Sequence, residues 1–273
     1  MINDTPLVRE FWENGSAESC PVVDMHGHLG TFAGIWFPRP SAEEMVISMD
    51  EANVRLLVFC PHATLFVPEI GNAPSIEAVR QFPDRLRAYI GINPHYPEAI
   101  ARDLAAFDAN ADVFLGVKIL ADYHKTPMIA PAYESAFRFA NERKLLVLMH
   151  TWGGSQFDGA PIVRQIAQQY PDATLLLGHS LHGAWDEAAK MAQDFPNVYL
   201  ELTAVLDNDR GVMEKWVEAG LSTRMLFGTD LPWFSPLRGI GSILSADIAD
   251  EDRHNILHRN AEKLLARFPE MRL

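Results

Sequence analysis

The sequence is poor in cysteine, with only Cys20 and Cys60 among its 273 residues. Two cysteines cannot build a disulfide framework, and these two do not form the C-x-x-C spacing of a zinc or redox motif. We therefore expect a protein of a reducing compartment, whose stability comes from its hydrophobic core.

The sequence is also short of positive charge and of long apolar runs. Lysine and arginine number 23 against 36 aspartates and glutamates, a formal net charge of -13. Such a chain is repelled by nucleic acid and by anionic membranes. No run of about 18 apolar residues could span a bilayer, and the first residues contain no apolar segment of a secretion signal. We expect a cytoplasmic enzyme that acts on a small molecule and has no nucleic-acid or membrane partner.

What the sequence does have is a repeated strand and helix pattern. Short apolar runs recur at intervals of roughly 30 residues, and a helical periodicity follows each. Such continuous runs are typical of strands covered on both faces. They are PVVDMH (21–26), RLLVFC (55–60), RLRAYIGI (85–92), DVFLGVKI (112–119), LLVLMH (145–150), ATLLLGH (173–179), VYLELT (198–203) and RMLFGTD (224–230). Eight units predict an α/β fold, a (β/α)8 TIM barrel, as a single domain over 1–273.

Helix signals separate these runs. Ser41 and Glu44 form a predicted capping box, and periodic patterns follow Pro131, Pro161 and Gly183. A last helix over about 249–267 is predicted to complete the outer ring. The segment 31–41 is predicted to be the first loop at the active face.

Histidine and aspartate residues stand at the ends of four predicted strands. They are His26, His28, His150, His179 and Asp230. In a His-x-His strand both rings point to the same side, because side chains alternate. The carboxyl ends of barrel strands meet at one mouth, so these groups converge on one point. A single histidine is more often structural than a ligand, but this joint pattern predicts a metal site.

Lys118 lies near the end of the fourth predicted strand. It would be a cation facing a substrate carboxylate, or its stem would simply extend past the barrel rim. We favour the substrate role and one metal.

The motifs resemble those of the amidohydrolase superfamily, in the amidohydrolase-related branch that includes proteins similar to aminocarboxymuconate semialdehyde decarboxylase. They are D-M-H-G-H (24–28), G-V-K (116–118), M-H-T (149–151), L-G-H (177–179) and F-G-T-D-L-P-W (227–233), followed by R-N-A (259–261). The resemblance covers essentially the whole chain. It implies that His26, His28, His150 and Asp230 bind a divalent metal, usually zinc, with His179 beside them. It also implies an alternative for Lys118, because binuclear members of the superfamily bridge two metals with a carboxylated lysine or a glutamate near the end of this strand.

Such a site favours hydrolysis. A metal ion held by three imidazoles and a carboxylate lowers the pKa of a bound water towards about 7. Asp230 would take a proton during attack, and His179 would polarise a carbonyl. We expect a hydrolase of an amide, lactone or ester-like bond in a small carboxylated molecule. The alternative is non-oxidative decarboxylation, which the same residues would serve.

Further candidates for substrate contact are His62, His182 and Trp152, which follow predicted strands. Rival classes remain open: a TatD-type nuclease, which the acidic surface and Lys118 oppose, a metal-free lactonase, and a binding protein on a decayed barrel. A homodimer is the oligomeric state considered.

Overall fold

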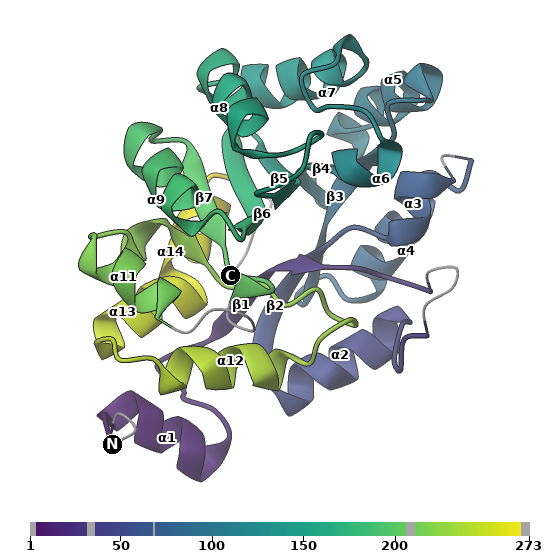
Figure 1. The fold of residues 1–273 in the computed structure, drawn as a ribbon. Coiled ribbons are helices and arrows are strands. Elements are labelled where there is room, and N and C mark those ends of the chain that lie inside the picture. Colours follow the sequence, from purple (N-terminus) through teal and green to yellow (C-terminus); the bar gives the residue numbers. More distant parts are fainter. Residues whose placement is uncertain (1–3, 32–35, 68, 206–210, 269–273) are drawn as a thin grey trace.

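Eight parallel strands form one sheet in the computed structural model, which describes residues 4–31, 36–67, 69–205 and 211–268 (Figure 1). Neighbours in the sheet follow the chain order. The strands are β1 (Val22–Gly27), β2 (Val54–Phe59), β3 (Leu86–Ile92), β4 (Phe114–Ile119), β5 (Leu146–Trp152), β6 (Thr174–His182), β7 (Val198–Glu201) and β8 (Met225–Leu226). The Met25 N–H donates to the Phe227 carbonyl at 2.9 Å, which joins β1 to the chain after β8. The predicted (β/α)8 barrel is confirmed.

Helices surround the sheet and alternate with its strands (Figure 1). They are α1 (Pro6–Asn14), α2 (Ala42–Glu51), α3 (His62–Phe66), α4 (Ala73–Gln81), α5 (Pro97–Ala105), α6 (Ala121–His124), α7 (Pro131–Glu142), α8 (Ala160–Gln169), α9 (Trp185–Asp194), α11 (Val212–Glu218), α12 (Pro236–Ser245), α13 (Asp250–His254) and α14 (Asn260–Leu265). The capping box at α2 is confirmed, since Ser41 Oγ accepts from the Glu44 N–H and Glu44 Oε2 from the Ser41 N–H.

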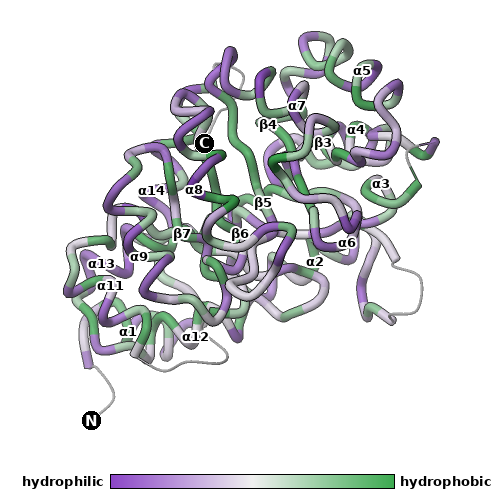
Figure 2. The backbone as a smooth tube through the Cα atoms, turned by 45° about the horizontal axis from the view of Figure 1, so that its top comes forward, coloured by the Kyte–Doolittle hydropathy of each residue, from purple (hydrophilic) through white to green (hydrophobic). Residues whose placement is uncertain are grey.

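The core has two layers. One hydrophobic cluster lies between strands and helices, and a second fills the barrel interior. Figure 2 shows hydrophobic residues along the central strands, whereas the helices alternate between hydrophilic and hydrophobic. Because both faces of the strands are buried, the strand sequences are continuously apolar.

The C-terminal helical segment differs from the prediction of a continuous outer helix. It consists of α13, a π-helical turn over Asn255–Arg259, and α14. Ala261, Leu264 and Leu265 belong to the cluster inside the barrel. Asn260 Nδ2 donates to the carbonyls of Ser222 and Met225, where β8 begins. The apolar face of α14 therefore closes the amino end of the barrel and leaves the carboxyl end open.

Among the described residues, no helix combines the length and the apolar character needed to cross a bilayer.

Candidate active site

His26 occupies the centre of the candidate site, fully buried on β1. Its Nδ1 lies 2.8 Å from Glu201 Oε2. Glu201 fills the space next to Gly228, where an added Cβ would lie 2.0 Å from Glu201 Oε1. Only glycine fits there, and this explains the glycine of the F-G-T-D motif.

Glu201, at the end of β7, ties three parts of the barrel together. Its Oε1 accepts from the Thr203 N–H at 2.7 Å and from Thr203 Oγ1 at 2.6 Å. Its Oε2 faces His26 and also accepts from the His179 N–H at 3.2 Å. A fully buried carboxylate with this many donors stays ordered and fixes the rings that it touches.

Three further imidazoles each have Nδ1 held by an acceptor. His28 Nδ1 lies 2.8 Å from the Cys60 carbonyl, and His179 Nδ1 lies 3.3 Å from the Thr203 carbonyl. His150 Nδ1 lies 2.8 Å from Asp158 Oδ2. A neutral ring that donates from Nδ1 has a lone pair at Nε2. The three Nε2 atoms are therefore in the form that binds metals.

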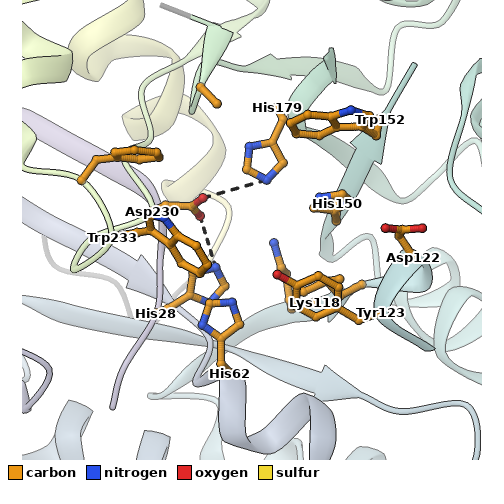
Figure 3. Close-up of a pocket in the computed structure, with 13 residues that line it drawn as sticks. His28, His62, Lys118, Asp122, Tyr123, His150, Trp152, His179, Asp230 and Trp233 are labelled. Atoms are coloured by element: carbon orange, nitrogen blue, oxygen red, sulfur yellow. Dashed lines mark ion pairs between the residues drawn. The ribbon is translucent and has the colours of Figure 1, made fainter. Parts of the chain in front are cut away.

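The Asp230 carboxylate lies between the rings of His28 and His179 (Figure 3) and also contacts His26. Its Oδ1 lies 3.0 Å from His26 Nε2 and 3.2 Å from His28 Nε2, and its Oδ2 lies 4.0 Å from His179 Nε2. Although Oδ1 is buried, none of these contacts has hydrogen-bond geometry at that atom. A buried carboxylate oxygen that faces the Nε2 atoms of several imidazoles in poor hydrogen-bond geometry is suited to a cation, either a proton on one ring or a metal ion.

The electrostatics also favour a positive charge on His26. Burial and Lys118 disfavour its charged form, but Asp230 and Glu201 outweigh them and raise the pKa of His26 to about 9. Burial alone would raise the pKa of Asp230, but His26 and His179 outweigh it and hold this pKa well below its ordinary value. Burial lowers the pKa of His28 to about 4. A proton on His26 balances the carboxylates, and a metal ion at Nε2 would take its place.

The ligand set can be compared with the one that the sequence implies. His26, His179 and Asp230 each offer a ligand atom within 4.8 Å of the others. His28 joins them through Asp230, whereas the His150 ring lies on the far side of His179, with centroids 4.9 Å apart. All five predicted residues thus meet at the mouth, and His179 lies closer to the centre than the sequence indicates.

Lys118 lies on β4 below this group and is buried. Its Nζ is 2.8 Å from His26 Nε2. Burial lowers the pKa of Lys118, with partial opposition from Asp230. The neutral amine is the form that reacts with carbon dioxide to give a carbamate, so the lowered pKa is compatible with a carboxylated Lys118.

A pocket of about 360 Å³ opens above these residues. Figure 3 shows aromatic side chains on both sides of the cluster. The lining residues are His28, His62, Lys118, Leu120, Asp122, Tyr123, His150, Trp152, His179, Ala204, Asp230, Trp233 and Phe234. Of the expected contacts, His62 and Trp152 line the pocket, and His62 stacks on His28 at 3.8 Å. His182 lies behind Trp152, stacked on it at 4.0 Å, and does not line the pocket.

The backbone is strained where two of these side chains enter the site. His179 has φ 64° and Asp230 has φ 59°, both in the left-handed region that residues other than glycine seldom adopt. The barrel holds them there through the hydrogen bonds from the His179 N–H to Glu201 and from the Asp230 N–H to the His26 carbonyl, at 2.8 Å. Such strain is concentrated at functional sites.

Four residues of the site are missed by sequence reasoning: Glu201, Asp158, Asp122 and Tyr123. Glu201 carries a recognisable signal, since it is the one acid inside the predicted strand 198–203. Asp158 lies in the loop after β5, and nothing in the sequence pattern indicates that it returns to His150.

Three other polar residues on β1 or in the loops after the strands do not line the pocket. Arg39 forms an ion pair with Glu51 at 2.6 Å, away from the pocket lining. Asn93 donates to the Leu65 carbonyl. Asp24 lies beneath the site, where it accepts from the His26 N–H and from Thr229 Oγ1. The first loop lies partly outside the described residues, at 32–35.

The family model described as "Amidohydrolase" matches residues 23–267. The chain therefore belongs to the amidohydrolase family, an enzyme family, and the resemblance seen in its motifs is confirmed. No curated protein sequence matches the chain.

Solved structures with the same fold include enzymes of two reaction types. An uncharacterised TIM-barrel protein from Bordetella bronchiseptica is 20% identical with a TM-score of 0.73, over 90% of this chain and 98% of that one. A dihydroxybenzoic acid decarboxylase from Polaromonas sp. JS666 is 16% identical with a TM-score of 0.75, over 93% and 100%. A probable 2-pyrone-4,6-dicarboxylic acid hydrolase from Acinetobacter baumannii is 13% identical with a TM-score of 0.64, over 89% and 98%.

Proposed function

We propose that this protein is a metal-dependent hydrolase of a small carboxylated molecule with an amide, lactone or ester-like bond. The observation that carries the proposal is the Asp230 carboxylate, whose Oδ1 contacts the Nε2 atoms of both His26 and His28 without hydrogen-bond geometry. Such an arrangement suits a cation, and its position at the carboxyl end of the barrel is that of TIM-barrel active sites.

One divalent metal ion would be held by His26, His28 and Asp230, with His150 as the further ligand. When bound, it supplies Lewis-acid polarisation and an activated water. Imidazole-rich sites prefer zinc, although the Polaromonas decarboxylase structure contains manganese. Zinc is our proposal for this chain.

Asp230 and His179 move the proton. The low pKa of Asp230 keeps its carboxylate ionised, so it can accept the proton of the attacking water and return it to the leaving group. His179 is neutral, because burial lowers its pKa, and its Nε2 lone pair faces the same place. We therefore propose that His179 accepts a proton. The role expected from the sequence, polarisation of a carbonyl, would need an N–H at Nε2.

Lys118 and the aromatic walls would define the substrate. Among the described lining residues, Lys118 is the only lysine or arginine. Burial disfavours the charged form of Lys118, and a substrate carboxylate beside it would favour that form. Trp152, Tyr123 and Trp233 provide flat apolar surface suited to a ring. His62 contributes to the same wall, whereas His182 would act indirectly, by holding Trp152 in place.

Decarboxylation is the second candidate function. The same pocket pairs a cation with flat walls, which suits an aromatic acid, and the Polaromonas decarboxylase structure contains 2-nitroresorcinol. In that reaction a protonated Asp230 or His179 would deliver a proton to the carbon that loses carbon dioxide.

The first experiment tests the metal site that both functions need. Wild-type protein, Asp230→Ala, His150→Ala and His179→Ala are purified without chelator, and bound metal is measured by plasma mass spectrometry. We expect about one zinc per chain, lost in Asp230→Ala and His150→Ala and kept in His179→Ala. Two metals per chain would make Lys118 a carbamate bridge, and no metal after reconstitution would overturn the proposal.

The reaction is then assayed with carboxylated lactones, amides and aromatic acids in ¹⁸O-labelled water. Label in an acid product supports hydrolysis, and labelled bicarbonate from a ¹³C-carboxyl substrate supports decarboxylation. We propose in addition a cytoplasmic location and no nucleic-acid partner. We also propose a homodimer, and light scattering of the purified protein tests this oligomeric state.

A further inference from the structure

A second group of metal-ligand side chains lies at the opposite end of the barrel. Cys20 stands just before β1, so it lies at the amino end of the strands. His254 ends α13, and His258 lies in the π-helical turn that follows. We call these three residues the Cys20 cluster.

The three side chains face one another at ligand distances. Each offers one ligand atom, and these atoms all lie within 4.8 Å of one another. His254 Nδ1 and His258 Nε2 are 3.0 Å apart, with the rings edge to face at a centroid distance of 5.3 Å. The π-helical turn contributes to this arrangement, and such turns are rare and frequent at functional sites.

The surroundings of the cluster suit a cation. His258 Nδ1 lies 3.1 Å from Glu262 Oε2, one helical turn further on. A carboxylate behind a histidine is the partner that metal-bound imidazoles usually have. Glu10, Asp250 and Glu262 act on the Cys20 thiol, against the single positive charge of Arg259. Arg259 is itself paired with Glu251 at 2.5 Å.

We propose that Cys20, His254 and His258 form a second, structural site for a metal ion that prefers sulfur and imidazole, with zinc as its occupant. A thiolate with two imidazoles selects zinc, copper or cobalt over magnesium and calcium. The thiol loses its proton to solvent as the sulfur binds, and the two imidazoles bind as neutral ligands.

This site would join the chain before β1 to the helix that closes the barrel. Cys20 is held between the first strand and the C-terminal segment, whose α14 covers the interior core. A metal ion there would act as a cross-link between regions more than 200 residues apart, and would stabilise the barrel without taking part in its chemistry.

Without a metal, the same residues have a simpler explanation. One imidazole donates to the other across the 3.0 Å contact, and burial raises the pKa of Cys20 to about 12, which keeps the thiol protonated. The two explanations differ in whether Cys20 forms a bond to a metal, so a spectroscopic test of that bond distinguishes them.

Cobalt is the probe, because a thiolate bound to Co²⁺ gives an intense near-ultraviolet charge-transfer band. The candidate active site has no cysteine among its proposed ligands, so this band reports only on the Cys20 cluster. Metal-free full-length protein is titrated with Co²⁺. We expect the band in wild type, its loss in Cys20→Ser and His254→Ala, and its retention in Cys60→Ala, which removes the other buried thiol.

Zinc then provides a second readout. In an Asp230→Asn background, saturating zinc should raise the Tm by roughly 5 °C, and Cys20→Ser should abolish the shift. No cobalt band in wild type, a band only at millimolar cobalt, or a band lost in Cys60→Ala would overturn the proposal. If Cys20→Ser does not fold, His254→Ala decides by the same band. None of these outcomes depends on the proposed hydrolase activity.

Discussion

The two sides of the candidate active site are built differently. On the inner side, His26, His28 and Asp230 are 0%, 3% and 9% exposed, and Glu201 beneath them receives several hydrogen bonds. On the outer side, Trp152 and Tyr123 are 39% and 38% exposed. The further proposed ligand, His150, contacts Asp158 through Nδ1 and packs its ring against Trp152 and Tyr123.

This difference indicates a division of labour. Groups that must hold a metal ion are preorganised by a buried network, because small displacements of ligands weaken binding steeply. Groups that meet a substrate lie on the accessible side, where a ligand enters and leaves. Substitutions on the inner side should therefore weaken metal binding strongly, and substitutions on the outer side should weaken it only slightly.

The largest effect is expected for Asp230→Asn. The variant removes the negative charge that faces His26 and His28, and with it the proposed metal ligand and proton acceptor. We expect kcat/KM to fall by about 10² to 10⁴-fold, together with loss of bound metal. Steady-state kinetics and metal analysis check this, with circular dichroism as the control for folding. Full activity with metal retained would exclude Asp230 from both roles.

Glu201→Gln tests the support of the inner side. Glutamine keeps the size of the side chain but replaces one acceptor oxygen by a donor, which would face the His26 ring or Thr203. We expect metal affinity to fall about 10 to 100-fold. Competition with a chromophoric chelator measures the affinity. Unchanged affinity would show that the network below His26 is not needed for the metal.

The fold could be predicted from the sequence because the strand signals are local. Each strand contains a buried apolar run. His26, His150 and His179 lie in the carboxyl-terminal half of β1, β5 and β6, and His28 and Asp230 follow β1 and β8. The supporting residues are different. Asp158 reaches His150 through a loop, and His182 is turned away from the pocket by its stacking on Trp152. Those positions depend on loop geometry and packing, which strand periodicity does not encode.

The C-terminal segment illustrates the same limit. Its periodicity predicts one helix. A π-helical turn closes its hydrogen bond over one residue more than an α-helical turn, and this small difference leaves the periodicity almost unchanged. Ala261 and Leu265 of the following α14 pack in the cluster inside the barrel. Tertiary packing decided this feature, and the local sequence could not.

Asp24→Asn probes the layer beneath the inner side through pH. Burial raises the pKa of Asp24 from 3.8 to about 7, so the folded protein keeps a proton that the unfolded chain loses above about pH 4. Wild-type stability should therefore decrease as pH rises from about 4 to 7. Asparagine does not titrate, so the stability difference between variant and wild type should shift in favour of the variant by about 2 kcal/mol between pH 5 and pH 7.

Urea unfolding of the metal-free proteins at these two pH values measures this difference. The comparison of variant with wild type cancels the titration of groups that both share. A difference that does not change with pH would mean that Asp24 is ionised throughout, held by its contacts with the His26 N–H and Thr229 Oγ1.

The smallest effect is expected for Asp158→Asn, which tests the outer side. The Asp158 side chain contacts His150 through Oδ2, and the other oxygen, Oδ1, is buried without a hydrogen bond. Asparagine can still accept from His150 Nδ1 through its amide oxygen, so the ring keeps its orientation and loses only the charge behind it. We expect metal affinity to fall by less than about tenfold, below the effect of Glu201→Gln. The same chelator competition compares the two variants directly. If Asp158→Asn weakens metal binding as much as Glu201→Gln, His150 belongs with the rigid ligands, and the boundary between metal side and substrate side must move outward to Trp152 and Tyr123.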